Sequence, residues 1–338
     1  MDSSPFLRYL IIGKLSRDFI LTPDGGAYLD KPGGSLLYAA AGAGVWESGI
    51  GLVGRVGEDY PQEWINQAKR AGLDIRGIHF LHDAIDLRAF FAYLDFNTCQ
   101  TDNPVSHFAR LELSFPKSLL GYTAPGPVVD SRIQSTPLTI RASDIPPDYL
   151  DATAAHLCPL DFLSHSLLPP ALRQGQVTTI TMDPSPGYMD PNFWDHIPAL
   201  VNGITALITS ERKLRNLFQG RSEDLWEMAE TIASYGCSMV IIKRGSQSQY
   251  LYERAKGGKW LIPAYPARVF DPTGAGQAFC GGFLTGFRAT YSPLEGALAG
   301  NISASLAIEG HGPFYALDTL PGLTRYRMEA LRDMVRRV

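Results

Sequence analysis

Residues 271–282 read Asp-Pro-Thr-Gly-Ala-Gly-Gln-Ala-Phe-Cys-Gly-Gly, and this stretch decides how the chain is interpreted. Gly274 and Gly276 allow a tight turn, so that the backbone amides of Ala275, Gly276 and Gln277 can point together at an anion. The apolar run that follows is typical of a helix, whose positive N-terminal end would lie at the same place. The stretch therefore predicts an anion-binding loop, and the alternative is a glycine-rich turn that binds nothing.

Short apolar runs alternate with segments of helix length along the chain. Most runs are continuous, which is typical of strands buried on both faces; they occupy residues 6–13, 49–57, 154–160, 177–185, 206–210 and 238–245. Candidate helices occupy residues 59–72, 161–174, 190–200 and 222–236, and Asp59, Asp161 and Ser222 are candidate N-caps. We therefore expect an α/β fold with a central, mostly parallel sheet flanked by helices on both faces. Ligands should bind at the carboxyl ends of its strands.

Two regions depart from this alternation. Residues 14–32 are turn-rich and extended, and residues 86–96 alternate in part, as a strand with one wet face does. Both would fit a small sheet that stands off the main body. Residues 97–148 are rich in proline and predict a loop-heavy surface segment. We expect a single domain over residues 1–338.

The composition is that of an ordinary globular protein. The formal net charge is -4 and the basic residues are scattered, so no electrostatic feature favours nucleic acid or an anionic membrane as a partner. The four cysteines stand far apart, which predicts buried free thiols rather than disulfides or a zinc site. The N-terminal apolar run lacks a basic leader and is too short to span a bilayer, so we expect a cytoplasmic location.

Several common enzyme motifs are missing from the sequence. It has no GxxxxGK[ST] loop, no clean GxGxxG after the first predicted strand and no HExxH. None of the seven histidines stands in a catalytic or metal-binding pattern, and His156 is interpreted as a core histidine. An unrelated α/β oxidoreductase is therefore the weakest of the functional alternatives.

The order of motifs along nearly the whole chain resembles the PfkB, or ribokinase-like, family of carbohydrate kinases. These motifs are GKLSRD at 13–18, Gly33-Gly34, GLVGRVGEDY at 51–60, MDPSP at 182–186, VIIKRG at 240–245, DPTGAGQAFCGGF at 271–283 and GNISASLAIEGHG at 300–312. The resemblance implies a small β-sheet lid, formed by about 14–32 and 82–113. It also implies ATP and Mg²⁺ as cofactors and transfer of the γ-phosphoryl group to a hydroxyl of a sugar or polyol.

On the acceptor side, the resemblance gives three positions a role. Asp18 matches the acidic residue that accepts hydrogen bonds from sugar hydroxyls, and Gly33 and Gly34 match the diglycine that borders the sugar. Two carboxylate oxygens suit two neighbouring hydroxyls. The alternatives are a solvated turn aspartate and a simple helix-entry turn. An exposed edge of the lid could also pair with a second copy, so a homodimer through the lid is an expectation.

On the nucleotide side, the resemblance implies two groups of residues. The residues that would border ATP or steady the transferring phosphoryl group are Lys243, Arg244, Gly245, Thr273, Gly274, Ala275 and Gly276. Asn301 and Ser305 match the helix that flanks the adenine, and a helix-packing role is the alternative for both.

Two departures from the family pattern concern the acceptor. The family has an aspartate after GAG that takes the proton of the attacking hydroxyl, whereas this chain has Gln277. An amide can hold a hydroxyl but cannot accept its proton. Tyr38 stands where the family commonly has an asparagine that contacts the sugar. A changed substrate, a lost contact and simple core packing all remain open for Tyr38.

A third departure concerns the metal. The Asn-x-x-Glu element that organises Mg²⁺ in the family aligns with Ser210 and Lys213, so that a cation replaces an acid. Glu211 could substitute, although a glutamate at a helix start is the commoner explanation. Asp271 is the other carboxylate that could serve through a metal-bound water. Two hypotheses result: a slow ATP-dependent sugar or polyol kinase, or a pseudokinase that binds sugar or nucleotide without turnover.

Overall fold

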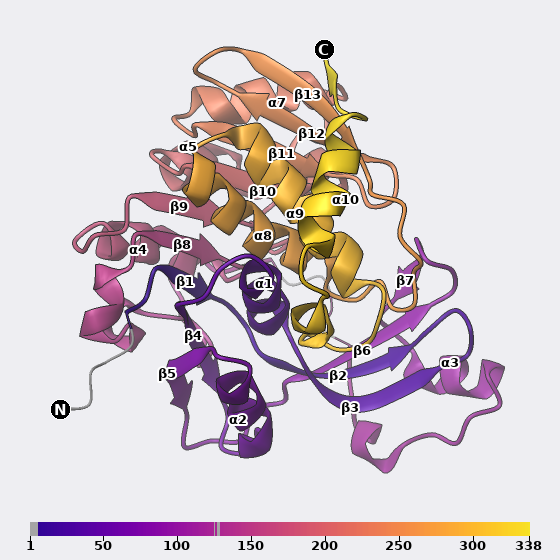
Figure 1. The fold of residues 1–338 in the computed structure, drawn as a ribbon. Coiled ribbons are helices and arrows are strands. Elements are labelled where there is room, and N and C mark those ends of the chain that lie inside the picture. Colours follow the sequence, from indigo (N-terminus) through magenta and orange to yellow (C-terminus); the bar gives the residue numbers. More distant parts are fainter. Residues whose placement is uncertain (1–5, 125, 127–128) are drawn as a thin grey trace.

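The protein is built on one ten-stranded sheet. The computed structural model describes residues 6–124, 126 and 129–338. The strand order is β14 (Arg336–Arg337), β13 (Gly258–Pro263), β12 (Ser248–Glu253), β11 (Met239–Lys243), β10 (Ala206–Ser210), β9 (Thr179–Met182), β8 (Ala154–Leu157), β1 (Tyr9–Ile12), β4 (Ile50–Val56) and β5 (Asp74–Phe80). Strands β11 to β5 run parallel, and β12 to β14 extend the sheet antiparallel (Figure 1). All six predicted strands are present.

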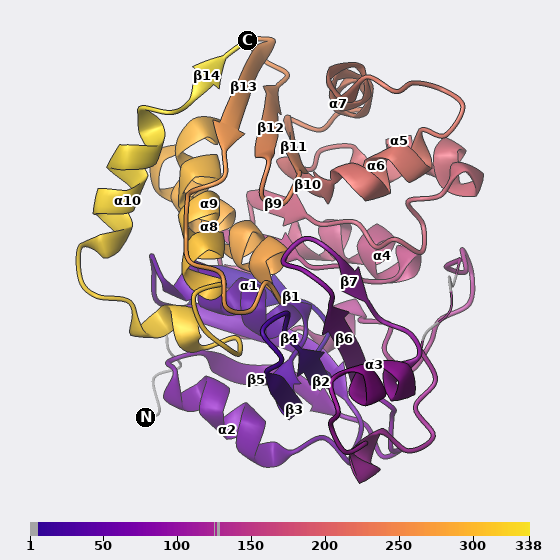
Figure 2. The same cartoon turned by 90° about the vertical axis from the view of Figure 1, so that its right-hand side faces the viewer.

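Helices cover both faces of this sheet, as the continuous apolar runs predicted. The helices are α1 (Ser35–Gly44), α2 (Gln62–Arg70), α3 (Pro104–Arg110), α4 (Phe162–Leu172), α5 (Ile197–Val201), α6 (Glu211–Leu217), α7 (Leu225–Ser234), α8 (Ala275–Thr290), α9 (Pro293–Ala307) and α10 (Leu323–Arg332). Figure 2 shows α4 to α7 on one side and α8 to α10 on the other. In β1, Leu10 and Ile12 pack into the first of these layers, whereas Tyr9 and Ile11 pack against the layer that contains α1.

A second, four-stranded sheet stands off the main body. Its order is β3 (Ala27–Gly33), β2 (Ser16–Leu21), β6 (Arg88–Tyr93) and β7 (Cys99–Gln100), and it lies at the lower right of Figure 1. Phe19 and Phe90 form a core of its own with Phe108 of α3. The two segments that departed from the strand and helix alternation therefore pair with each other, β2 with β6, in a parallel register.

The helix that follows the glycine-rich stretch packs unusually close to α1. A Cβ atom on Gly281 would lie 1.8 Å from the carbonyl oxygen of Ala39, and one on Gly42 would lie 2.1 Å from that of Ala278. Only glycine allows two backbones to approach in this way. Because α1 follows the diglycine and α8 follows the GAG turn, this contact holds the two motifs side by side.

Some local predictions were wrong. Asp161 caps α4 by accepting from the Ser164 amide, as predicted, but α2 begins after Pro61 and the Asp59 carboxylate accepts from Ile85 instead. Asp224 rather than Ser222 caps α7, because its carboxylate reaches the amides two and three residues ahead. The segment 190–200 contains a 3-10 helix (Pro191–His196) before α5.

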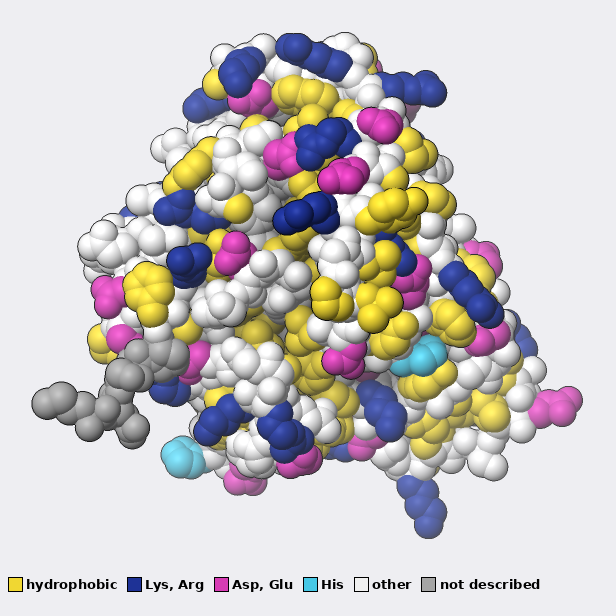
Figure 3. Space-filling model, viewed as in Figure 1, with side chains coloured by type: hydrophobic (Ala, Val, Ile, Leu, Met, Phe, Trp, Pro, Cys, Tyr) yellow, Lys and Arg dark blue, Asp and Glu magenta, His cyan; other side chains and the backbone are white. Residues whose placement is uncertain are grey.

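Surface features agree with the composition. On the face drawn in Figure 3, basic and acidic side chains are interspersed rather than gathered by sign. All four thiols are free and three are buried, but Cys99 is exposed at the edge of the small sheet, so its predicted burial was wrong. Among the described residues, no helix is long and apolar enough to cross a bilayer.

Candidate functional site

The predicted anion loop, residues 271–277, is a compact turn at the N-terminus of the 16-residue helix α8. Gly274 adopts φ +80°, and the ring of Tyr38 lies so close that a Cβ atom at Gly274 would stand 2.0 Å from its Cδ1 atom. Asp271 accepts from the Thr273 amide over 2.9 Å. Two of the three predicted donors also make bonds within the loop, since the amide of Ala275 reaches Pro272 O at 3.3 Å and that of Gln277 reaches Gly274 O at 2.9 Å.

A buried carboxylate, Asp183, lies beneath this loop and gathers three partners. Its side chain is 1% exposed, and it forms ion pairs with Lys213 and, over 2.8 Å, with Lys243. The Nε2 atom of Gln277 donates to the same carboxylate over 2.8 Å. Lys243 Nζ also donates to the carbonyl oxygen of Gly276 over 2.9 Å. The last turn of the loop is thereby tied to the ends of β9 and β11.

The two lysines control the charge of Asp183. Burial alone would raise its pKa, but the charges and hydrogen bonds of Lys213 and Lys243 overcome burial and hold the pKa of Asp183 well below its ordinary value. Burial lowers the pKa of Lys213, and the like charge of Lys243 acts in the same direction. For Lys243, the attraction of Asp183 outweighs burial and raises the pKa. The surroundings therefore favour the charged forms of Asp183 and Lys243 and disfavour the charged form of Lys213.

Asp183 is the residue that the sequence reasoning missed. The MDPSP motif was recognised but no role was assigned to its aspartate. The available signal was positional, because Asp183 directly follows the buried strand β9 and the strands β9, β10 and β11 are parallel neighbours. Polar residues at the carboxyl ends of adjacent parallel strands meet at one edge of the sheet. That rule would have placed Asp183 beside Lys243.

Asp18 lies at the base of the small sheet, against the diglycine. Its side chain is 1% exposed, and the Ser16 hydroxyl donates to Oδ1 over 2.5 Å. A Cβ atom on Gly33 would lie 1.9 Å from Asp18 Oδ2, so a larger residue here would displace the Asp18 carboxylate. Burial raises the pKa of Asp18 to about 7; the Ser16 hydrogen bond opposes this rise, whereas the charge of Asp271 adds to it.

A pocket of about 360 Å³, here called the aromatic pocket, opens between the small sheet and the main body. It is lined by Ile20, Tyr28, Asp30, Lys31, Pro32, Tyr38, Trp64, Gln67, Asp271, His311, Gly312, Pro313, Phe314 and Tyr315. Asp271, the first residue of the anion loop, reaches into it, and its Oδ2 lies 3.3 Å from His311 Nδ1. The hydroxyl of Tyr38 is buried and lacks a partner among the described residues.

A second pocket of about 720 Å³, here called the basic pocket, is linked to the loop through Lys243, which lines it and donates to Gly276 O. It is lined by Asn97, Ser210, Glu211, Arg212, Arg215, Lys243, Arg244, Gly245, Ser246 and Gln247. The predicted nucleotide residues Lys243, Arg244 and Gly245 are all part of this lining. Glu211 pairs with both Arg244 and Arg215 over 2.7 Å, so its carboxylate is already neutralised. This geometry favours the structural explanation of Glu211 over a role as a metal ligand.

Neither Asn301 nor Ser305 lines the basic pocket, and both side chains make hydrogen bonds within the protein. The Asn301 side chain is 3% exposed, accepts from the Tyr265 amide and donates to Gln249 and to Pro263 O. The Ser305 hydroxyl donates to Ile302 O and accepts from Arg327. The polar atoms of both side chains are hydrogen-bonded to other protein groups, which favours the helix-packing alternative over an adenine contact.

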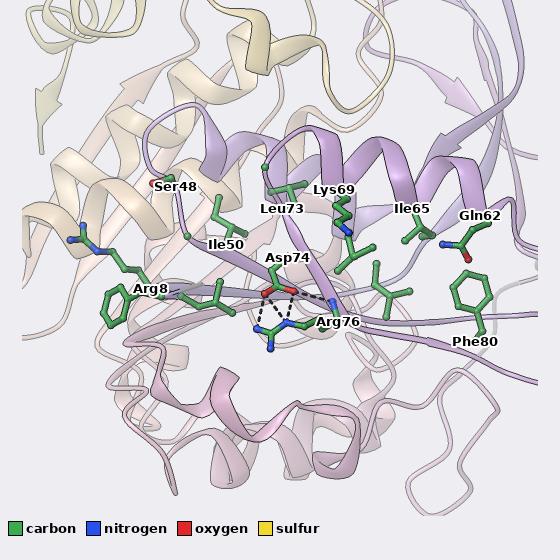
Figure 4. A pocket seen from close by; sticks show the side chains of 16 residues that line it. Arg8, Ser48, Ile50, Gln62, Ile65, Lys69, Leu73, Asp74, Arg76 and Phe80 are labelled. Atoms are coloured by element: carbon green, nitrogen blue, oxygen red, sulfur yellow. Dashed lines mark hydrogen bonds and ion pairs between the residues drawn. The ribbon is translucent and has the colours of Figure 1, made fainter. Parts of the chain in front are cut away.

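A wider groove of about 1000 Å³ lies apart from these motifs, between α2, β5 and the segment before β1 (Figure 4). Its lining is largely apolar, and Arg76 is paired with Asp74 over 2.7 Å. None of the predicted site residues lines it, so its size does not make it the candidate site.

Comparison with known proteins identifies the class. A model of the pfkB family carbohydrate kinases matches residues 152–320, which is half of the chain, and the chain belongs to this family. It is 28% identical to the cytidine kinase of Thermococcus kodakarensis over 292 residues, covering 86% of this chain and 91% of that protein.

Solved structures show the same fold. The nucleoside kinase of Burkholderia thailandensis in complex with inosine matches with a TM-score of 0.68 at 21% identity, covering 96% of this chain and 98% of that one. A fructokinase with bound ATP from Xylella fastidiosa matches with a TM-score of 0.66 at 16% identity, covering 96% of this chain and 98% of the fructokinase chain. The predicted ribokinase-like α/β fold is therefore confirmed.

Proposed function

We propose that this protein transfers the γ-phosphoryl group of ATP to a hydroxyl of a small sugar or polyol. The observation that carries the proposal is that the anion loop is connected to both pockets. Its first residue, Asp271, lines the aromatic pocket. Lys243, which holds the Gly276 carbonyl near the other end of the loop, lines the basic pocket. An acceptor in the first pocket and a triphosphate in the second would meet at the loop.

Different residues are assigned to binding the phosphates, binding the acceptor and orienting its hydroxyl. The cations of the basic pocket attract the phosphates, and Lys243 presents its charge beside the loop. Asp18 accepts hydrogen bonds from acceptor hydroxyls, and the small sheet excludes water as a lid. Gln277 orients the attacking hydroxyl, because its Oε1 atom is buried and unpartnered among the described residues while Nε2 is held by Asp183.

The described residues contain no group of three or more His, Cys, Asp or Glu that could hold a metal ion. Were Mg²⁺ to bind with the nucleotide, Asp271 is the residue that would hold it, through a bound water. When bound, Mg²⁺ neutralises charge on the phosphates. This pattern fits ATP–Mg²⁺ arriving as one ligand.

The reaction should be slow, because Gln277 cannot take the hydroxyl proton, which must pass to water or to a phosphate oxygen late in the transfer. A positioned general base contributes roughly 10² to 10⁴ in rate. The test is ADP formation with ATP and Mg²⁺ across a panel of sugars and polyols, for the native protein and for Lys243→Met as a matched loss of the loop cation. Acceptor-dependent ADP formation that the variant loses supports the proposal. Absence of acceptor-dependent ADP across the panel contradicts it.

A second candidate function is that of a pseudokinase, and the Asp183 cluster favours it. Lys213 replaces the family's acidic residue and forms an ion pair with Asp183. Gln277 replaces the family's base and donates a hydrogen bond to the same carboxylate. Ligand binding without catalysis would raise the melting temperature without consuming ATP. Steady turnover by the native protein would exclude this candidate.

A further inference from the structure

The aromatic pocket contains more ring surface than a free sugar requires. Its ring-bearing side chains are Tyr28, Tyr38, Trp64, His311, Phe314 and Tyr315. They come from the small sheet, from α1, from α2 and from the segment after α9, so the rings gather only in the folded chain. A sugar or cyclitol is recognised chiefly through its hydroxyls, whereas flat rings favour a planar, stacking ligand.

One wall of the pocket is already a stack. The rings of Tyr28 and His311 lie with centroids 3.5 Å apart at an interplanar angle of 28°. Tyr28 belongs to β3 of the small sheet and His311 to the main body, where it also contacts Asp271. This wall therefore joins the small sheet to the first residue of the anion loop and presents flat surface at their junction.

The helix α2 supplies a ring and an amide on the same side. Trp64 and Gln67 are three residues apart, a spacing that places both on one helix face, and both line the pocket. Trp64 is fixed edge-on by Tyr60, with centroids 5.4 Å apart at 82°. A glutamine amide offers one acceptor and two donors, which suits the hydrogen-bonding edge of a nucleobase.

The opposite end of the pocket suits a sugar. Tyr38 packs on Gly274 of the anion loop, and its buried hydroxyl has no hydrogen-bond partner among the described residues. Asp271 lines the same end, and its charge is felt by the buried Asp18. Hydroxyl-binding groups thus lie near the loop, and stacking groups lie toward α2 and the small sheet.

We propose that the acceptor is a nucleoside, with its sugar at the anion loop and its base against Trp64 and Gln67. This assignment rests on the proposed function only in taking the aromatic pocket as the acceptor site. Gln67 acts on the base edge and Trp64 on the base face, so the two side chains affect nucleosides and leave free ribose untouched.

Equilibrium binding tests the assignment without requiring turnover. Cytidine, adenosine, inosine, free ribose and myo-inositol are titrated calorimetrically against the native protein, with and without a non-hydrolysable ATP analogue and Mg²⁺. We expect at least one nucleoside to bind about tenfold or more tightly than ribose and inositol, which is the scale of one base–aromatic stack. Equal affinity for ribose and all nucleosides, or tighter binding of inositol, overturns the assignment.

Variants locate the binding. Trp64→Leu should lower nucleoside affinity about tenfold while leaving ribose affinity unchanged, and Tyr326→Leu, at an exposed ring on α10, is the matched control. If Trp64→Leu does not fold, Gln67→Leu is the second variant. It removes no ring and should likewise lower nucleoside affinity without changing ribose affinity. Equal losses for ribose and nucleosides overturn the assignment.

The outcome also separates this assignment from the reaction. Nucleoside binding without ADP formation supports the assignment and overturns only the proposed catalysis. ADP formation with sugars or polyols but with none of the nucleosides overturns the assignment and leaves the catalysis standing.

Discussion

The Nε2 atom of Gln277 lies 2.8 Å from Asp183 Oδ2, and this bond fixes which end of the amide faces Asp183. The donor end is used, and the buried Oε1 acceptor has no hydrogen-bond partner among the described residues. An aspartate at position 277 would present a second negative charge to Asp183. The amide avoids that repulsion and keeps a hydrogen bond. It cannot, however, accept the proton that an aspartate could take.

Gln277→Asp is expected to increase turnover. The new carboxylate would be one methylene shorter, and Lys213 and Lys243 would help to balance its charge beside Asp183. If proton removal limits the native protein, kcat should rise by about 10² or more. The measurement is kcat for ADP formation with the best acceptor found, and Gln277→Asn, which has the same length without the charge, is the control. An equal change in both variants would show that side-chain length rather than basicity matters.

Much of the fold could be predicted because its signals are local. The strands β1, β4, β8, β9, β10 and β11 are continuous apolar runs, and burial on both faces requires such runs. The GAG turn was recognisable because glycine is needed where Gly274 adopts a positive φ. Those features depend on neighbours in sequence.

The Asp183 cluster could not be predicted in the same way. Asp183, Lys213, Lys243 and Gln277 are each separated by at least thirty residues, and they meet only because β9, β10 and β11 are adjacent strands. The same holds for the aromatic pocket, where Tyr28 stacks on a histidine from the far end of the chain. Sequence patterns identify elements, but contacts across strand ends depend on the order of strands in the sheet.

Lys243→Met should cost more stability than Lys213→Met, because the fold favours the charged form of Lys243 and disfavours that of Lys213. The two variants should also differ in nucleotide binding. Each leaves Asp183 with one cation, so each should cost less than the roughly 3–5 kcal/mol that accompanies loss of a sole buried partner. Only Lys243 lines the basic pocket, and only Lys243 holds the Gly276 carbonyl. Denaturant unfolding and ATP-analogue titration together give both quantities. Equal loss of nucleotide affinity in the two variants would contradict a separate role for Lys243.

Gly33→Ala should disrupt the acceptor site through Asp18. The added Cβ atom would lie 1.9 Å from Asp18 Oδ2, so either the carboxylate or the end of β3 must move. We expect acceptor affinity to fall by tenfold or more, with a lower melting temperature. Gly126→Ala is the control, because an added Cβ there meets none of the described residues within 4 Å. Native-like acceptor affinity in Gly33→Ala would remove Asp18 from the site.

Asp18→Asn should stabilise the protein at pH 8 while weakening acceptor binding. The folded-state pKa of Asp18 is raised from 3.8 to about 7, chiefly by burial. Because the folded protein disfavours the charged form, the stability linked to this group is fully present below about pH 4 and is lost as the pH rises through about 7. A difference of about three pH units corresponds to about 4 kcal/mol.

Asparagine cannot ionise, so the variant should lose this pH dependence. Its melting temperature should exceed that of the native protein at pH 8, and the two should converge toward pH 5, where Asp18 is mostly protonated in the folded state. The exposed Asp102→Asn is the control and should follow the native profile. Calorimetric unfolding at pH 5, 6, 7 and 8 measures the difference. A native profile that stays parallel to that of Asp18→Asn over this range would mean that Asp18 is ionised throughout. Ionisation of the buried Asp18 carboxylate would then not reduce the stability of the folded protein.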